Sequence, residues 1–245
     1  MPMTDFPNPL NSNLSVIRAR IECACRAADR DPAEVRLLPV SKTVDVATLR
    51  AAYSAGLREL GENKVQEALA KSEVMADLTD LRWVLIGHLQ TNKAKYAARF
   101  ASEFQALDSL RVAEALDVHL QKLGRGLDVL VQVNTSGEAS KFGLPPEEVE
   151  GFVRQLPAFT ALRVHGLMTL AALSSDQAEV RRCFVRLREL RERLRQSAPE
   201  GVHMDELSMG MSGDFEMAIA EGATTVRVGS AIFGQRPAIR PDTDA

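Results

Sequence analysis

Lys42 is the residue whose type and position most directly suggest chemistry. It follows a mostly apolar segment, residues 36–41, that is typical of a short buried strand. The residues after it, Thr43 to Asp45, predict the start of a helix, so the amine would lie at a strand tip. A partly desolvated lysine shifts its pKa readily and can attack a carbonyl group. Position alone leaves two interpretations, a solvated rim lysine and a lysine that forms a Schiff base.

Two loops late in the chain combine glycine with serine where a helix is expected to begin. The first covers residues 209–214 and contains Ser212, and the second covers residues 228–231 and contains Gly229 and Ser230. Backbone N–H groups and the helix dipole at such a position favour an anion such as phosphate. One such loop alone is more often an ordinary turn with a serine N-cap. Two of them favour a phosphate site, although Asp214 could take part of the same dipole.

Three more polar residues stand at the ends of expected strands. Arg227 either forms a structural salt bridge or faces a ligand, where its permanent charge could keep a pyridine nitrogen unprotonated. His88 could line a pocket or cap a helix, and Asn63 could donate to a ligand oxygen or cap a helix. His165 and His203 occur too early in their strands to join His88 in a metal site.

The elements that would position these residues alternate along the chain. After a helix at 10–30, we expect strands at 36–43, 57–61, 81–88, 104–108, 127–134, 162–169, 204–209 and 224–228, each followed by a helical segment. Strict alternation indicates parallel βαβ units, and eight units favour a closed (β/α)8 barrel with its active site at the carboxyl ends of the strands. A doubly wound open sheet is the alternative, but no G-x-G-x-x-G follows the first strand.

We therefore predict an α/β fold, a (β/α)8 TIM barrel. It would form a single domain over residues 1–245, with an extra N-terminal helix, no C-terminal β-domain, and loose termini at 1–9 and 236–245.

Composition narrows the classes of function. A content of 45% hydrophobic and 26% charged residues is ordinary for a soluble globular protein. A net charge of -3 gives no electrostatic case for nucleic acid or anionic membranes. The three cysteines have no zinc or redox spacing, and no signal peptide or membrane-spanning stretch is evident. These features predict a reduced, cytoplasmic protein that binds neither nucleic acid nor a membrane.

Six motifs, in order along the chain, closely resemble those of the pyridoxal phosphate homeostasis protein family. They are Pro39-Val40-Ser41-Lys42-Thr43, Gly61-Glu62-Asn63-Lys64, the segment 86–93 (IGHLQTNK), Gly166-Leu167-Met168-Thr169, the segment 207–212 (LSMGMS) and the segment 226–234 (VRVGSAIFG). The resemblance implies a barrel related to the N-terminal domain of alanine racemase that binds pyridoxal 5'-phosphate (PLP).

The same resemblance assigns expected roles to individual residues. Lys42 would hold PLP as an internal aldimine, Arg227 would contact the ring nitrogen, and Asn63 and His88 would lie by the ring. Ser212, Gly229 and Ser230 would hold the phosphate. Lys141 matches a family lysine near the site, with no role fixed.

The resemblance leaves two classes of function open. An alanine-type racemase needs a lysine and a tyrosine on opposite faces of the substrate carbon, the tyrosine coming from a second domain. Tyr53 and Tyr96 are the only tyrosines, and neither ends a strand. With arginine at the pyridine nitrogen the ring would also withdraw electrons weakly. We expect a monomeric, non-enzymatic carrier that buffers PLP and hands it over to PLP-dependent apo-enzymes, affecting amino-acid and keto-acid balance indirectly. The alternative is a small PLP-dependent racemase or decarboxylase.

Overall fold

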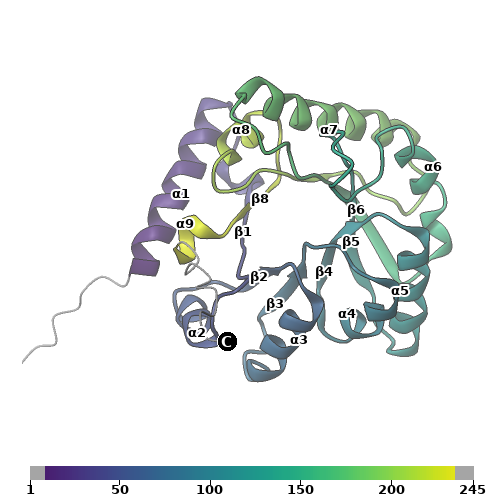
Figure 1. Cartoon of the computed structure of the whole chain (residues 1–245), viewed down its shortest axis with the longest axis horizontal. Helices are drawn as coiled ribbons and strands as arrows, with labels where there is room; N and C mark the ends of the chain where they lie inside the picture. The colour runs from purple at the N-terminus through teal and green to yellow at the C-terminus, as the bar shows by residue number, and fades with distance from the viewer. Residues whose placement is uncertain (1–8, 235–245) are drawn as a thin grey trace, which may run out of the picture.

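The computed structural model of the chain describes residues 9–234 and has the barrel architecture that the alternating elements predict. Figure 1 shows the helices arranged around the outside of the strands. All strand pairs are parallel, and the order around the sheet is β1-β8-β7-β6-β5-β4-β3-β2. The strands are β1 (Arg36–Pro39), β2 (Glu59–Glu62), β3 (Arg82–Leu85), β4 (Glu103–Leu107), β5 (Leu127–Gln132), β6 (Leu162–Met168), β7 (Glu206–Ser208) and β8 (Thr225–Val228).

The helices follow the strands as expected, with one additional helix at the start. They are α1 (Pro9–Ala27), α2 (Val46–Ser54), α3 (Val65–Val74), α4 (Ala94–Phe100), α5 (Leu110–Lys122), α6 (Val149–Val153), α7 (Gln177–Ser197), α8 (Phe215–Ala220) and α9 (Ser230–Phe233), with 3-10 turns η1 (Pro32–Glu34), η2 (Thr91–Lys93) and η3 (Leu156–Ala158). No helix within residues 9–234 has both the length and the apolarity to cross a bilayer. The segments 1–9 and 236–245, predicted to be loose, lie outside the described residues except for Pro9, which begins α1.

Helix α1 joins the beginning of the described chain to its end. Its apolar stripe, which includes Leu14, Ile17 and Ile21, is buried. The helix packs on α8 and α9, beside which it lies in Figure 1. The side-chain amide of Asn13 also donates to the carbonyl of Ile232, at 2.9 Å. The predicted extra helix therefore supports the last β/α unit of the barrel.

The barrel is nearly closed, and one of its shortest strand pairings, which we name the seam, lies between β1 and β2. Seven neighbouring strand pairs form regular parallel ladders or shorter pairings, but β1 and β2 share only a bridge between Val40 and Gly61. The amide of Ser41 donates to the carbonyl of Gly61 at 2.9 Å, beside this bridge. The seam therefore closes immediately before Lys42.

Several elements are shorter than their sequence patterns predict. The strands expected at 36–43 and 204–209, for example, cover only Arg36–Pro39 and Glu206–Ser208. The helix expected at 147–155 covers only Val149–Val153, and the chain then passes through a turn into η3. The strand expected at 81–88 ends at Leu85. A β-carbon at Gly87 would lie 2.2 Å from the carbonyl oxygen of Asn63, so only glycine fits this close approach between the ends of β2 and β3.

The barrel interior is part apolar and part polar. Leu38, Val40, Val84 and Ile86 form a separate apolar cluster of buried residues from the β1 and β3 side. The polar part, which we name the axial chain, is a series of hydrogen bonds linking Arg36, Glu103, Gln105, Ser208 and Arg227. Strands β4 and β7 are not neighbours in the sheet, so the bond between Gln105 and Ser208, at 2.6 Å, crosses the barrel.

Candidate functional site

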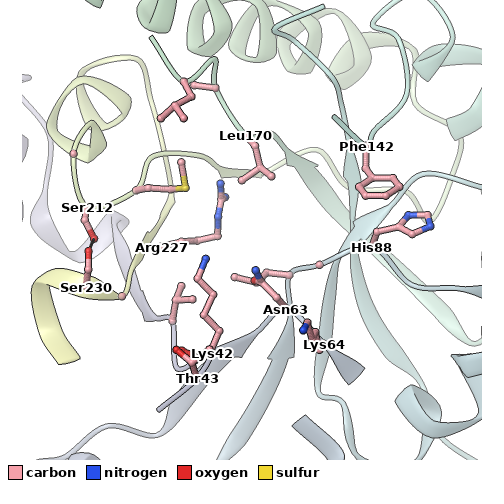
Figure 2. A pocket seen from close by; sticks show the side chains of 18 of the residues that line it. Lys42, Thr43, Asn63, Lys64, His88, Phe142, Leu170, Ser212, Arg227 and Ser230 are labelled. Carbon is pink, nitrogen blue, oxygen red and sulfur yellow. Dashed lines mark hydrogen bonds between the residues drawn. The ribbon is translucent and has the colours of Figure 1, made fainter. Parts of the chain in front are cut away.

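A cavity of about 1510 Å³ lies where the loops after the strands converge. It brings together every residue that the sequence placed in a cofactor site: Lys42, Asn63, His88, Ser212, Arg227, Gly229 and Ser230. In Figure 2 Lys42 and Arg227 extend toward the same space, with the serine pair on one side and His88 on the other. Parallel barrels place their active sites at this end, because all strand carboxyl ends meet there.

Arg227 enters the cavity wall from β8 and is buried. Its guanidinium donates to the hydroxyl of Ser208 at 2.6 Å and to the backbone carbonyl of Thr169 at 2.7 Å. Burial lowers the pKa of Arg227 to about 10, against the opposing charge of Asp214. No carboxylate within residues 9–234 forms an ion pair with it, so the structural salt bridge considered from the sequence is not present. The side chain remains a charged donor at neutral pH.

Ser212 and Ser230 come from the loops after β7 and β8, and their hydroxyl oxygens are 3.4 Å apart. Gly229 allows this arrangement, because a β-carbon there would lie 3.0 Å from the carbonyl oxygen of Val40. The β8 loop can therefore approach the end of β1 and the lysine that follows. The two hydroxyls form a compact donor pair that suits an anion.

Asp214 accepts one of the backbone N–H groups of the β7 loop, as its place in the sequence suggested. Its carboxylate accepts the backbone N–H of Met211 at 2.5 Å. Burial raises the pKa of the Asp214 carboxyl, despite that hydrogen bond and the charge of Arg227. A proton on Asp214 would reduce its repulsion of an anion bound beside the serines.

His88 lies on the opposite side of the cavity, against a residue that the sequence reasoning did not single out. Its ring stacks on Phe142 with centroids 4.0 Å apart and planes 8° from parallel. Its Nδ1 atom is 3.4 Å from a carboxylate oxygen of Asp108. Neither the imidazole ring nor Phe142 lies beside Lys42 in Figure 2.

The cavity is cationic although the chain is acidic overall. Its lining contains five cationic side chains and two carboxylates, Lys42, Lys64, Lys93, Lys141 and Arg227 against Asp45 and Asp214. Lys141 donates to Glu138 at 2.7 Å and to the carbonyl of Ala171 at 2.8 Å, linking two loops of the mouth. Such a lining favours an anionic ligand.

Metal-ligating residues do not converge anywhere in the part of the chain from Pro9 to Gly234. His165 and His203 stack on each other with ring centroids 6.1 Å apart. His165 also contacts Asp128, a residue near the start of β5, at 3.1 Å. This places the two histidines at the end of the barrel away from His88.

Sequence reasoning missed the groups that hold the site in place. Arg227 is oriented from within the barrel by the Ser208 hydroxyl and the Thr169 carbonyl, and Ser208 is in turn bonded to Gln105. A polar residue in a strand gives no sign in the sequence that it faces the barrel interior. Lys71 is buried beneath the Lys42 loop. The sequence could have indicated Lys71, because this charged residue lies on the buried stripe of α3, three positions after Ala68.

Comparisons with known proteins agree with this geometry. The alanine racemase N-terminal domain family matches residues 12–237. A protein of Pseudomonas aeruginosa named pyridoxal phosphate homeostasis protein is 43% identical over 224 residues, covering 91% of this chain and 94% of that protein. The solved structure of PipY from Synechococcus elongatus PCC7942 with PLP bound is 37% identical, with a TM-score of 0.81, and covers 92% of this chain and all (100%) of that one.

A more distant likeness concerns the fold alone. Alanine racemase from Streptomyces coelicolor A3(2) is 20% identical with a TM-score of 0.71. The match covers 94% of this chain but 58% of the racemase. The barrel of that enzyme is therefore similar to this chain, while the rest of it has no counterpart in the match.

Proposed function

This chain belongs to the pyridoxal phosphate homeostasis protein family and has the alanine racemase N-terminal domain fold, and on that premise we propose that it binds PLP, buffers it and hands it over. The proposal rests above all on one observation. Lys42, Arg227 and the Ser212–Ser230 pair, which come from three different parts of the chain, line a single cationic cavity. These are an amine, a fixed charged donor and an anion-binding pair, which are the groups that PLP requires.

The residues present fit PLP group by group. The paired hydroxyls of Ser212, after β7, and Ser230, on the β8 loop that Gly229 allows to come close, would hold the phosphate. Arg227 would donate to the pyridine nitrogen, since its buried guanidinium already donates to uncharged oxygens and keeps its proton. Asn63 would contact the ring region from the end of β2.

Lys42 would be the covalent attachment point. When bound, PLP supplies an aldehyde that a lysine amine can capture and a ring that withdraws electrons from an attached amino acid. The amine of Lys42 lies at the tip of β1, in the cavity that Arg227 and the serines share. The loop carrying Lys42 also touches the loop carrying Gly229, which fixes the amine relative to the phosphate-binding hydroxyls.

The carrier interpretation is supported by where the possible proton donors lie. Tyr53 donates to Asp80, and Tyr96 lies on α4 against Lys95, so neither lines the cavity formed by residues 40–234. Lys141 is held by Glu138 and Ala171. An arginine beside the ring nitrogen would further weaken the ring as an electron sink. Curated relatives are named homeostasis proteins, which agrees with a role other than turnover.

Covalent capture can be tested directly. Purified protein incubated with PLP should gain the absorption band of a protonated lysine adduct, and borohydride reduction followed by peptide mapping should find the label on Lys42. The Lys42→Ala variant should lose the band completely, whereas Lys64→Ala, at another cavity lysine, should keep it. A Lys42→Ala protein that retains the band and its borohydride-trapped label would refute the proposal.

The enzyme alternative requires a separate measurement. The holoprotein is incubated with a panel of L- and D-amino acids, and racemisation and decarboxylation are followed. Enzymes typically turn over about 10 times per second. We expect rates far below one per second, and racemisation of any amino acid at more than a few per second would replace the carrier assignment with the racemase alternative.

We also propose that PLP-dependent apo-enzymes receive the cofactor and that the carrier acts as a cytoplasmic, single-domain monomer. Mixing holoprotein with an apo-enzyme should restore the activity of that enzyme faster than the spontaneous release of PLP allows. Equal rates would instead support simple buffering. Light scattering of the holoprotein would establish its oligomeric state.

A further inference from the structure

The turn that carries Lys42 lies at one of the shortest strand pairings of the barrel, the seam between β1 and β2. β1 and β2 are joined only by the bridge between Val40 and Gly61 and by the bond from the Ser41 amide to the Gly61 carbonyl. A lysine at the edge of so short a contact would move with any opening of the seam. Something else must fix its position if the amine is to meet a ligand held on the other side of the cavity.

A buried ion cluster, which we name the seam cluster, lies beside this contact. Its members are Glu62 at the end of β2 and Glu67 and Lys71 on α3. The ammonium of Lys71 donates to Glu62 at 2.7 Å, to Glu67 at 2.7 Å and to the Ser41 carbonyl at 2.8 Å. All three of its protons are therefore used, which explains how a lysine is tolerated with 7% of its surface exposed.

The seam cluster forms hydrogen bonds to the residues on both sides of Lys42. On one side, the hydroxyl of Ser41 donates to Glu62 at 2.6 Å, and the carbonyl of Ser41 accepts from Lys71. On the other side, the backbone N–H of Thr43 donates to Glu67 at 2.8 Å. The two residues that flank Lys42 are thus bonded to different members of one cluster, Ser41 to Glu62 and Lys71 and Thr43 to Glu67.

The backbone of Thr43, which is bonded to the seam cluster, has an unfavourable conformation. Its φ of 65° lies in the left-handed region, which a β-branched residue rarely adopts. Such a conformation persists only where the surroundings over-determine it. The bond from Thr43 to Glu67 supplies that restraint from α3, while Lys71 links Glu67 to the Ser41 side.

We propose that Glu62, Glu67 and Lys71 are positioning residues that set the Lys42 amine for covalent capture of PLP. The inference rests on the proposed function and adds a reason why PLP would attach to Lys42 and not to another lysine of the cavity. Several other lysines line the cavity, and Lys64, Lys93 and Lys141 have amines that could react. Lys42 is preferred because its turn is held in a single geometry. Lys71 does not compete, since its three protons are committed and it does not line the cavity.

Glu67 offers the sharpest test, because its side chain is partly exposed and its loss should leave the fold intact. Glu67→Ala removes the bonds to Thr43 and Lys71, whereas Glu67→Gln keeps an oxygen that can accept both. A misplacement of about 1 Å can slow a reaction about 100-fold. We expect Glu67→Ala to capture PLP at Lys42 roughly 10- to 100-fold more slowly and Glu67→Gln to stay within about threefold of wild type.

The distribution of the label separates positioning from general stability. After borohydride reduction, wild-type protein should carry the label on Lys42, and Glu67→Ala should carry a larger share on Lys64, Lys93 or Lys141. Glu221→Ala is the matched control. Glu221 is a buried carboxylate paired with Arg181 and Arg188, outside the cavity. This control should lower the Tm without changing the capture rate or the labelled residue.

Lys71→Met provides a second variant, assayed at a temperature where circular dichroism shows it folded. It should slow capture at Lys42 at least as much as Glu67→Ala, because it frees the Ser41 carbonyl as well. Capture at the wild-type rate and only at Lys42 in both variants would overturn the inference while leaving the proposed function intact. Absence of a Lys42 adduct in wild-type protein would overturn both.

Discussion

Two arginines stand at opposite ends of the axial chain, and their partners differ. Arg227 is buried, and Arg36 is partly buried. At the amino-terminal end of the strands, Arg36 donates through two nitrogens to both oxygens of Glu103, each at 2.8 Å. At the cavity end, Arg227 donates to the Ser208 hydroxyl and the Thr169 carbonyl, which are uncharged. The charge of Arg36 is balanced by a carboxylate within the barrel, whereas the charge of Arg227, beside the cavity, has only uncharged hydrogen-bond acceptors.

The acid–base properties of the two arginines follow from this difference. Burial opposes the charge of Arg36, but the hydrogen bonds and charge of Glu103 outweigh it and raise its pKa above the usual value. Burial lowers the pKa of Arg227, because no carboxylate is close enough to compensate. A charge paired with a carboxylate suits stability. A charge compensated only by neutral acceptors suits a ligand that brings its own acceptor or negative charge.

The largest effect is expected from Arg36→Met. Glu103 is buried whereas Arg36 is partly exposed, so removal of Arg36 leaves a buried carboxylate without its cation and costs up to roughly 3–5 kcal/mol of unfolding free energy. Urea denaturation would measure the loss. PLP affinity of the folded protein should not change. A large loss of affinity would break the comparison by showing that the axial chain couples the two ends. Arg82→Met, at an exposed pair with Glu59, serves as a control and should cost at most about 1 kcal/mol.

Arg227→Met should have the opposite profile. Hydrogen bonds to charged groups contribute about 1.5–3 kcal/mol, so PLP affinity should fall roughly 10- to 100-fold. Unfolding free energy should decrease less than in Arg36→Met, because no carboxylate is left unpaired. Equilibrium titration with PLP and denaturation of the apoprotein give the two numbers. An Arg227→Met protein as unstable as Arg36→Met would remove the distinction between the two ends.

Ser212→Asp tests the anion side of the cavity with a smaller change. A carboxylate beside Ser230 should repel the phosphate and lose a donor, weakening PLP about tenfold. Ser212→Asn, of similar size but uncharged, should weaken PLP less. The ratio of the two dissociation constants reports the charge alone. Equal affinities for both variants would mean that another loop holds the phosphate.

Glu206→Gln should have the smallest effect and refine the account of the Arg36 end. Burial raises the pKa of the Glu206 carboxyl, the nearby Glu103 adds to the rise, and Arg36 opposes it. With a folded pKa above the unfolded one, stability is fully present below the unfolded value of about 4.3 and is lost as pH rises through the folded value. The variant should therefore melt about 1–3 °C above wild type at pH 7, and the difference should vanish near pH 4. A constant difference at all pH values would contradict this.

Much of the fold and the site could be predicted because local patterns repeat eight times. Apolar strands followed by amphipathic helices indicate parallel units, and the strand ends of a barrel converge whatever the loop details. This reasoning placed Lys42, Arg227 and the two serines in one cavity. It overestimated the helix at 147–155, which covers only Val149–Val153 before the chain turns into η3.

The supporting groups could not be predicted in the same way, because their partners are far apart in sequence. Arg36 pairs with Glu103, and Ser208 bonds to Gln105, across strands that are not neighbours. Nothing local in either strand specifies the partner. The ring contact between His88 and Phe142 likewise joins two loops whose approach depends on the completed barrel.

The pairing of β1 with β8 has a consequence for how the protein is made. Lys42 follows the first strand, and Ser230 follows the last, about 190 residues later, which at usual rates of translation means roughly 10 to 40 s of synthesis. During that interval a growing chain has the amine but no hydroxyl pair to retain a phosphate. On the proposed binding mode, stable loading would wait until the ribosome has produced the eighth strand. The amount of bound cofactor would then report the number of finished barrels, and unfinished chains would not deplete the supply of PLP.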